Sequence, residues 1–321
     1  MNNFTEQLYI KKIILNKDFI LAGDIGGTNT NFAVFDLNKR LILSLHLNTK
    51  KIKNFPEFIK EILSYIKSKY RISISKACFA IAGTFTNKNI IKMTNLPLLI
   101  DVNKLKKVTS LKNVYIINDF QAISYGIEFL NKKDIVVIKR GKPVKQAAKV
   151  VLGAGTGLGK SIMVYNEKSK DYTVLHSEGG HAEISYNNQD FELFEFLRKN
   201  SNNIIQWEDI LSGTGIRNIY MYLLRKNNTG GLLEIKKSGY NSELISKYKY
   251  KDEICNLTMK VFTRFYARCA KNFALDALAL NGVYIAGRIA IKNPELFTDK
   301  KFGFVMEFLN TRKINHILEA I

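Results

Sequence analysis

The chain has 321 residues, of which 46% are hydrophobic and 11% aromatic. This is enough for about two domains with sizeable cores, and too apolar for a disordered chain. No apolar run approaches the ~18 residues that a membrane span requires, and residues 1–12 hold no apolar signal-peptide segment. Cys78, Cys255 and Cys269 lie too far apart for a disulfide framework or a zinc pattern. We therefore expect a cytoplasmic protein without a membrane partner.

The balance of charge is strongly basic. Lysine and arginine number 49 against 28 acidic residues, a formal net charge of +21, which is typical of nucleic-acid binders. The lysines, however, gather only in short clusters, at residues 50–53, 104–112 and 247–251. We favour a solvated basic surface that attracts anions such as nucleotides, and we expect no nucleic-acid partner. A nucleic-acid-binding protein is the alternative.

The first part of the chain predicts an α/β unit. Apolar runs at residues 19–23, 32–35 and 41–47 predict strands, and the Gly-Gly-Thr-Asn turn between the first two predicts a hairpin. Apolar residues recur at helical spacing over residues 55–70, and the short apolar run over residues 77–82 predicts another strand. The expected order is β-β-β-α-β.

The second part of the chain echoes the first. Strands are expected at residues 114–117, 150–152, 161–165, 172–175 and 283–286, and helices at residues 121–130, 191–197, 216–224 and 257–280. Each half has a strand, a turn rich in glycine and threonine, and a second strand, with the turns at residues 24–29 and 153–159. This self-similarity predicts a duplicated α/β unit with a ligand cleft between the halves.

The two glycine turns are candidate phosphate sites. Successive glycines let backbone N–H groups close around an anion, and Thr28 and Thr156 add hydroxyl donors. Asp24 ends a predicted strand beside the first turn, where a carboxylate can hold Mg²⁺ through water next to phosphate. Glycine turns that only close hairpins are the alternative, which the occurrence of two matched turns weakens.

The second turn nearly matches a P-loop. Residues 154–161 read Ala-Gly-Thr-Gly-Leu-Gly-Lys-Ser, with alanine in place of the first glycine of that motif. A P-loop opens a helix, whereas residues 161–166 are rich in residues that favour strands. We therefore expect a strand after this turn and disfavour the P-loop interpretation.

Two further polar groups are candidates for chemistry. Asn118-Asp119 ends a predicted strand, where ligands gather in open α/β sheets, and a carboxylate there can accept a proton from an attacking hydroxyl. Capping of the next helix is an equally open alternative. Glu178 and His181 flank a Gly-Gly turn and Glu208 starts a helical stretch, a set suited to a polyhydroxylated ligand. His181 as a metal ligand or as a structural histidine is the alternative.

Six segments are informative because they occur together and in order. They are Leu-Ala-Gly-Asp-Ile-Gly-Gly-Thr-Asn at residues 21–29, Ile-Asn-Asp-Phe at 117–120, Leu-Gly-Ala-Gly-Thr-Gly-Leu-Gly at 152–159, Glu-Gly-Gly-His at 178–181, Glu-Asp-Ile-Leu-Ser-Gly at 208–213 and Gly-Val-Tyr-Ile-Ala-Gly at 282–287. From about residue 19 to its end, the chain resembles the bacterial-type glucokinase family, within the actin/hexokinase/Hsp70 ATPase-fold superfamily.

The resemblance implies a fold and a division into domains. The fold is α/β, a duplicated actin-like ATPase (ribonuclease H-like) fold whose two domains close over sugar and ATP and exclude water. Residues 1–129 would form the small domain, with the first phosphate loop and the catalytic aspartate. Residues 130–321 would form the larger domain, with the second phosphate loop and the segments that bind sugar and adenosine.

The resemblance also implies a role for each candidate residue. Asp119 would be the general base for the 6-hydroxyl of the sugar. The other sugar hydroxyls would be held by Asn118, Glu178, His181 and Glu208. The nucleotide and its Mg²⁺ would be bound by Asp24, Gly26, Gly27, Thr28, Asn29, Gly155, Thr156, Gly157 and Gly287, with Asp24 holding the metal through water. The implied activity is ATP-dependent phosphorylation of glucose to glucose 6-phosphate, in a homodimer. The alternatives are a kinase of another hexose and a catalytically weak sensor of sugar or nucleotide.

Three departures from the family pattern bear on these expectations. Arg288 replaces the second glycine that is usual after Ala286-Gly287, where it would pair with phosphate or crowd adenine. Ser177 stands where glycine often precedes Glu178. In the family a strand and a C-terminal helix follow a segment like residues 315–321, and this sequence shows neither.

Overall fold

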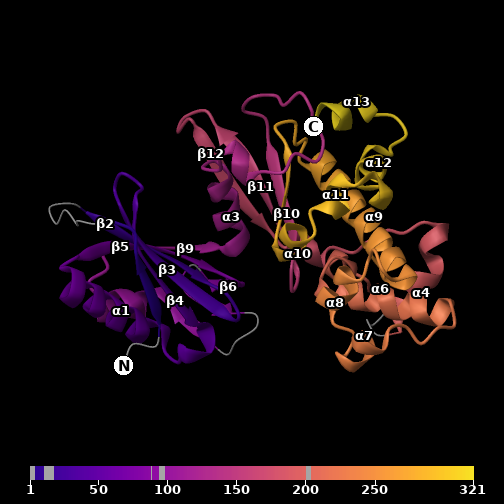
Figure 1. Cartoon of the computed structure of the whole chain (residues 1–321). Helices are drawn as coiled ribbons and strands as arrows, with labels where there is room; N and C mark the ends of the chain where they lie inside the picture. Colours follow the sequence, from indigo (N-terminus) through magenta and orange to yellow (C-terminus); the bar gives the residue numbers. More distant parts are fainter. Residues whose placement is uncertain (1–3, 11–17, 88, 94–97, 200–203) are drawn as a thin grey trace. The chain divides into compact units, whose positions relative to one another are not determined.

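The computed structural model describes residues 4–10, 18–87, 89–93, 98–199 and 204–321. The chain divides into two compact units, unit 1 (residues 1–122) and unit 2 (residues 123–321). Each unit is built on a main sheet of its own (Figure 1). Each also has its own apolar core. The division falls inside helix α3 (Asp119–Ile127), whereas the sequence places it between residues 129 and 130.

Unit 1 is built on a six-stranded sheet with the order β1-β4-β3-β2-β5-β9. Its strands are β1 (Thr5–Leu8), β2 (Phe19–Ile25), β3 (Asn29–Asp36), β4 (Leu41–Asn48), β5 (Ile74–Ile81) and β9 (Asn113–Asn118). The pairs β1–β4, β4–β3 and β3–β2 are antiparallel. The pairs β2–β5 and β5–β9 are parallel. The predicted strands and the predicted hairpin are confirmed, and β1 is an edge strand that the sequence does not indicate.

Helix α1 (Phe55–Tyr70) packs on one face of this sheet (Figure 1) and has the predicted bounds. The side chain of Asn54 caps its first turn by accepting a hydrogen bond from the Glu57 N–H. The ring of Phe55 meets the ring of Phe79 edge-on, with centroids 5.3 Å apart. Fully buried side chains of this size stabilise a fold by about 1.5–3 kcal/mol each, so the apolar stripe of α1 is what fixes the helix on the sheet.

A smaller antiparallel sheet completes unit 1. It consists of β6 (Gly83–Asn87), β7 (Ile90–Met93) and β8 (Leu99–Asp101), and helix α2 (Val102–Val108) follows it. None of these elements is predicted from the sequence. The strands are short and the segment mixes polar and apolar residues, so its periodicity is weak.

Unit 2 repeats the strand arrangement of unit 1. Its sheet has the order β12-β11-β10-β13, with β10 (Lys149–Ala154), β11 (Leu158–Asn166), β12 (Asp171–Ser177) and β13 (Val283–Ala286). Three antiparallel strands are followed by one that runs parallel to the first, as β5 does beside β2. The predicted duplication is therefore confirmed. Because β11 is a strand, the P-loop interpretation is excluded, as predicted.

Helices pack against the sheet of unit 2 around α9 (Glu253–Asp276), which is predicted to cover residues 257–280. The helix begins four residues before the predicted start, because the Asp252 side chain caps it by accepting a hydrogen bond from the Cys255 N–H. It ends four residues before the predicted end, just ahead of Leu278, whose positive φ of +45° is not helical. The other helices are α4 (Phe191–Arg198), α5 (Trp207–Ile210), α6 (Gly213–Lys226), α7 (Leu233–Lys237), α8 (Ser242–Lys247), α10 (Arg288–Lys292), α11 (Glu295–Thr298), α12 (Phe304–Leu309) and α13 (Asn315–Ala320). Within the described residues, no helix is both long enough and apolar enough to cross a membrane.

Candidate functional site

The carboxyl ends of β2, β5 and β9 meet at one edge of the sheet in unit 1. Ile25 pairs with Ile81, and Ile81 pairs with Asn118. Neighbouring strands lie ~4.8 Å apart, so the backbones of Ile25 and Asn118 are roughly 10 Å apart. The first glycine turn follows Ile25, and Asp119 follows Asn118. The structure thus brings Asp24, the first glycine turn and the Asn118-Asp119 pair to the same edge.

The first glycine turn, residues 26–29, is held in place by Thr49. The Gly26 N–H donates to the Asn29 carbonyl at 3.1 Å. The Thr49 hydroxyl donates to the Gly26 carbonyl at 2.8 Å, and the Thr49 N–H donates to the Thr28 carbonyl at 2.9 Å. These bonds fix the backbone of a turn that suits an anion. Sequence reasoning missed Thr49, because its contact depends on the pairing of β3 with β4.

Asp24 lies exposed near the end of β2, beside this turn. The Asn31 side chain donates a long hydrogen bond, 3.4 Å, from Nδ2 to its Oδ2. In the described parts of the chain, no group of three or more His, Cys, Asp or Glu side chains comes together to hold a metal ion. Mg²⁺ commonly takes one or two carboxylates, with phosphate and water as its other ligands. As a single exposed carboxylate beside the glycine turn, Asp24 fits Mg²⁺ through one of those waters.

Asn118 and Asp119 both turn toward the start of α3. The Phe120 N–H donates to Asn118 Oδ1 at 2.8 Å and to Asp119 Oδ1 at 2.9 Å, and the Asn118 N–H donates to Gln121 Oε1 at 3.0 Å. The capping alternative is therefore confirmed for Asn118, whereas Asp119 is itself the first residue of α3. This leaves the proton-accepting role of Asp119 open, because a carboxylate accepts hydrogen bonds at both oxygens.

In unit 2, the second glycine turn, residues 155–157, joins β10 to β11. The Gly155 N–H donates to the Gly157 carbonyl at 2.8 Å. The Gly213 N–H, in the first turn of α6, donates to the Gly155 carbonyl at 2.9 Å. The N-terminus of a long helix carries a partial positive charge and exposed N–H groups, which favour an anion. The turn is thus attached to a second element that suits phosphate.

Leu158 connects this turn to the other candidate residues of unit 2. Its N–H donates to Glu208 Oε2 at 2.8 Å. A Cβ placed on Gly157 would lie 2.3 Å from the same oxygen, and one placed on Gly180 would lie 2.1 Å from the Leu158 carbonyl oxygen. Only glycine fits at Gly180, where the clash is with the backbone, whereas a side chain at Gly157 would displace the Glu208 carboxylate. The turn over residues 178–181 and the Glu208 carboxylate therefore lie against one residue.

His181 is oriented by Gln206, which sequence reasoning missed. His181 Nδ1 lies 3.0 Å from Gln206 Oε1. An amide oxygen can only accept, so Nδ1 carries the proton and Nε2 is the acceptor. The Trp207 N–H donates to the Ala182 carbonyl at 3.1 Å, which ties the segment before Glu208 to the segment after His181. The structure thus brings Glu178, His181 and Glu208 into one neighbourhood.

The serine that departs from the family pattern supports the same turn. Ser177 Oγ accepts a hydrogen bond from the Gly179 N–H at 3.0 Å. Lys160 lies behind the turn, buried, with its ammonium 4.8 Å from the ring centre of Phe273 and 5.8 Å from that of Trp207. A Cβ on Gly179 would lie 2.9 Å from Lys160 Cδ. The turn is therefore packed against the Lys160 side chain as well as hydrogen-bonded to Ser177.

Gly287 ends the β13 segment against the second glycine turn. Its φ is +85°, and a Cβ there would lie 2.7 Å from the Ala154 carbonyl oxygen. Arg288 follows, 72% exposed, with Nη2 3.6 Å from Glu243 Oε1. Lys292 Nζ is closer to that oxygen, at 2.9 Å, and this hydrogen bond holds the pKa of Glu243 below its usual value. Arg288 is thus a loosely held cation next to the candidate nucleotide segments.

Comparison with known proteins identifies the family. Residues 21–321 match the profile of the glucokinase family. A glucokinase of Nostoc punctiforme is 30% identical, over 94% of this chain and 93% of its own. The crystal structure of a glucokinase from an Antarctic psychrotroph superposes with a TM-score of 0.78 at 26% identity, over 95% of this chain and 92% of its own. A ROK family glucokinase from Streptomyces griseus, solved with glucose and AMPPNP, shares the fold, with a TM-score of 0.60 at 15% identity over 92% and 91% of the two chains. The chain is a member of the glucokinase family and has the duplicated actin-like ATPase fold.

Proposed function

We propose that this chain transfers the γ-phosphoryl group of ATP to the 6-hydroxyl of glucose. The observation that carries the proposal is the arrangement around Leu158. Its N–H is bonded to Glu208, its carbonyl lies against Gly180, and it directly follows the second glycine turn. Side chains suited to a polyol thus adjoin a backbone suited to phosphate, in a chain of the glucokinase family.

In the proposed reaction, the O6 oxygen of the sugar forms a bond to the γ-phosphorus. The bond from that phosphorus to the β–γ bridging oxygen breaks, and ADP leaves with its electron pair. Asp119 accepts the proton that O6 loses. A positioned carboxylate of this kind contributes by making the hydroxyl oxygen a better nucleophile as the phosphoryl group arrives.

The remaining sugar hydroxyls are assigned to side chains of matching capacity. His181 Nε2 accepts from one hydroxyl, because its Nδ1 proton is taken up by Gln206. The carboxylates of Glu178 and Glu208 accept from others, and the amide of Asn118 can both donate and accept. A site that matches hydroxyls in this way rejects sugars that lack one of them, because a polar group covered by the bound sugar would lose its partner.

The nucleotide is assigned to the two glycine turns and to Gly287. The second turn and the N-terminus of α6 bind phosphate oxygens. The first turn and Asp24 hold the phosphates together with Mg²⁺, which when bound neutralises charge on the β- and γ-phosphates. Gly287 is assigned to adenosine by the family resemblance, and its position against Ala154 admits no side chain.

The test is a coupled assay of ADP release with Mg·ATP and glucose, mannose, fructose or glucosamine. We expect the highest kcat/KM with glucose, and a product phosphorylated at C6 by phosphorus–proton NMR. His181→Asn should raise the KM for glucose about two- to tenfold, since a hydrogen bond between neutral groups contributes about 0.5–1.5 kcal/mol. His316→Asn is the matched control, because His316 is exposed on α13. Absence of hexose-dependent ADP release would overturn the proposal.

A further inference from the structure

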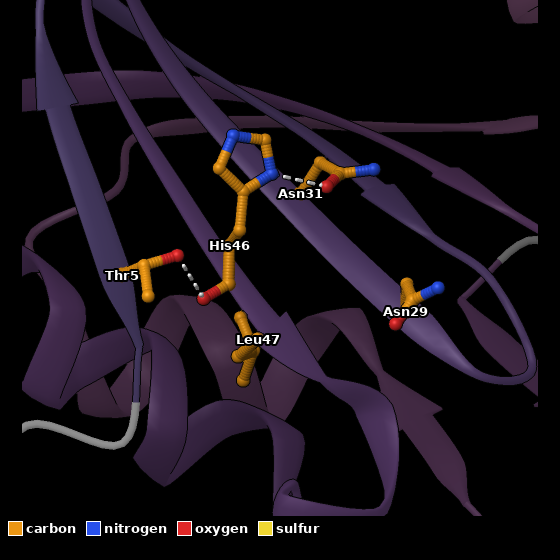
Figure 2. Close-up of a pocket in the computed structure, with 5 residues that line it drawn as sticks. All are labelled: Thr5, Asn29, Asn31, His46 and Leu47. Atoms are coloured by element: carbon orange, nitrogen blue, oxygen red, sulfur yellow. Dashed lines mark hydrogen bonds between the residues drawn. The ribbon is translucent and has the colours of Figure 1, made fainter.

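One face of the sheet in unit 1 carries polar side chains in register across four strands. Thr5 of β1 pairs with His46 of β4, His46 with Asn31 of β3, and Asn31 with Asp24 of β2. Residues paired in this way project to the same side of a sheet. An open pocket of about 430 Å³ on this face is lined by Thr5, Asn29, Asn31, His46 and Leu47 (Figure 2).

The hydrogen bonds along this row have a defined direction. His46 Nδ1 is hydrogen-bonded to Asn31 Oδ1 (Figure 2), and the two atoms are 2.6 Å apart. Because an amide oxygen only accepts, His46 donates from Nδ1. His46 Nε2, which is then an acceptor, lies 3.4 Å from Ser44 Oγ. With its oxygen turned to His46, the Asn31 amide presents Nδ2 to Asp24 Oδ2 at 3.4 Å. His46 therefore determines which end of the amide faces Asp24.

The row is polar, yet it does not belong to the core. His46 and Asp24 are exposed, and Asn31 is half-buried. On the opposite side of the same strands, Phe32 and Leu45 are buried and pack with the rest of the core. Hydrogen bonds on an exposed face contribute little to stability. Stabilisation of the fold is therefore a poor explanation for hydrogen bonds that run in one direction from His46 through Asn31 to Asp24.

We propose that Asn31 is a positioning residue for the Asp24 carboxylate, and that His46 holds Asn31 in the orientation that donates to it. This inference rests on the proposed function, in which Asp24 holds Mg²⁺ beside the phosphates of ATP. Hydrogen-bond partners behind the groups of a metal site fix the orientation of those groups, and their loss commonly lowers metal affinity or activity about 10–100-fold. Neither Asn31 nor His46 lies in the segments that the sequence marks as functional.

The experiment measures binding directly. Isothermal calorimetry of ADP at a series of Mg²⁺ concentrations, and of glucose separately, is applied to wild type, Asn31→Leu, His46→Leu and His46→Asn. We expect Asn31→Leu to raise the Mg²⁺ concentration for half-maximal ADP affinity about tenfold, with glucose affinity within about twofold. His46→Leu should act in the same direction. His46→Asn should restore most of the affinity, because its amide N–H replaces the Nδ1–H donor.

Two controls separate this inference from the proposed function. Thr5 lines the same pocket, but within the described residues its hydroxyl donates to the His46 backbone carbonyl and to no side chain of the row. Thr5→Val should therefore behave as wild type. Asp24→Asn should lose the Mg²⁺ dependence altogether. If Asp24→Asn loses it while Asn31→Leu and His46→Leu keep it, the positioning role is wrong and the proposed function stands. If Asp24→Asn retains it, the metal role of Asp24 fails, and the positioning role fails with it. Equal losses of ADP and glucose affinity in Asn31→Leu would show a structural role only.

Discussion

The carboxylate of Glu208 accepts a hydrogen bond from the backbone N–H of Leu158, 2.8 Å from Oε2. Leu158 is the first residue of β11, directly after the second glycine turn. A side chain assigned to the sugar is therefore also bonded to the segment assigned to phosphate. We therefore expect Glu208 to affect the binding of both glucose and ATP, whereas the other sugar-binding side chains should affect glucose alone.

Glu208→Ala should raise the KM for glucose and the KM for ATP together, each about tenfold or more, because one hydrogen bond to a charged group contributes about 1.5–3 kcal/mol. Glu178→Ala is the matched comparison. It should raise the KM for glucose alone, since no hydrogen bond among the described residues joins Glu178 to the second glycine turn. Steady-state kinetics with each substrate varied in turn distinguish the two. An unchanged KM for ATP in Glu208→Ala would show that the Leu158 contact has no role in nucleotide binding.

Gly287→Ala should destabilise unit 2. The residue has φ +85°, and the added Cβ would lie 2.7 Å from the Ala154 carbonyl oxygen. Backbone strain of this kind costs about 1–3 kcal/mol, to which the contact adds. Gly126→Ala is the control, because a Cβ there meets nothing within 4 Å and the position is helical. In that variant the free energy of unfolding should rise by about 0.5–1 kcal/mol. Urea unfolding midpoints check both, and equal midpoints for the two variants would count against the geometry at Gly287.

Arg288→Ala should raise the KM for ATP about fivefold at low salt and less at high salt. Arg288 is 72% exposed and only loosely paired with Glu243 at 3.6 Å, so its charge is available to nucleotide phosphate. An exposed ion pair contributes up to about 1 kcal/mol and is screened by salt. Lys292→Ala is the control, because Lys292 is held closer to Glu243, at 2.9 Å. A lower KM for ATP in Arg288→Ala would show instead that the side chain crowds the nucleotide.

The cysteines should be unreactive in the native protein. Burial raises the pKa of Cys269 to about 11, opposed in part by the neighbouring Lys160 ammonium, and burial also raises the pKa values of Cys255 and Cys78. At pH 8 we expect slow labelling by a thiol reagent, and labelling of all three thiols in guanidinium. Thiols of the unfolded chain ionise near their ordinary pKa of about 8.5, before those of the folded chain. The free energy of unfolding should therefore fall as the pH rises above that value. Fast native labelling of Cys269 would contradict its burial.

Local patterns were sufficient for the elements that have strong periodicity. Helix α1 has the predicted bounds because its apolar stripe, the Asn54 cap and Pro56 agree with one another. The strand at Val283–Ala286 is also found as predicted. The predicted end of α9 is wrong because buried Ala279 continues the apolar pattern after the helix has ended at Asp276. Apolar periodicity indicates which residues are buried, and the chain stays buried after the helix has ended.

The partners of the candidate residues could not be predicted from the sequence. Thr49 reaches the first glycine turn only because β3 and β4 pair, and Gln206 reaches His181 across 25 positions of the chain. Asn31 and His46 meet because their strands are in register. Motifs identify residues that are adjacent in sequence, whereas these contacts are fixed by strand pairing and by the packing of loops.

The most direct measurement is glucose-dependent ADP release by wild type and by Asp119→Asn, with glucose binding to both measured by calorimetry. The account predicts robust turnover by wild type. It predicts a kcat about 10²–10⁴ lower in the variant, with glucose affinity changed by less than about threefold. Wild-type turnover that survives in Asp119→Asn would show that another group accepts the proton. A wild-type chain that binds glucose and releases no ADP would contradict the assignment of kinase activity itself.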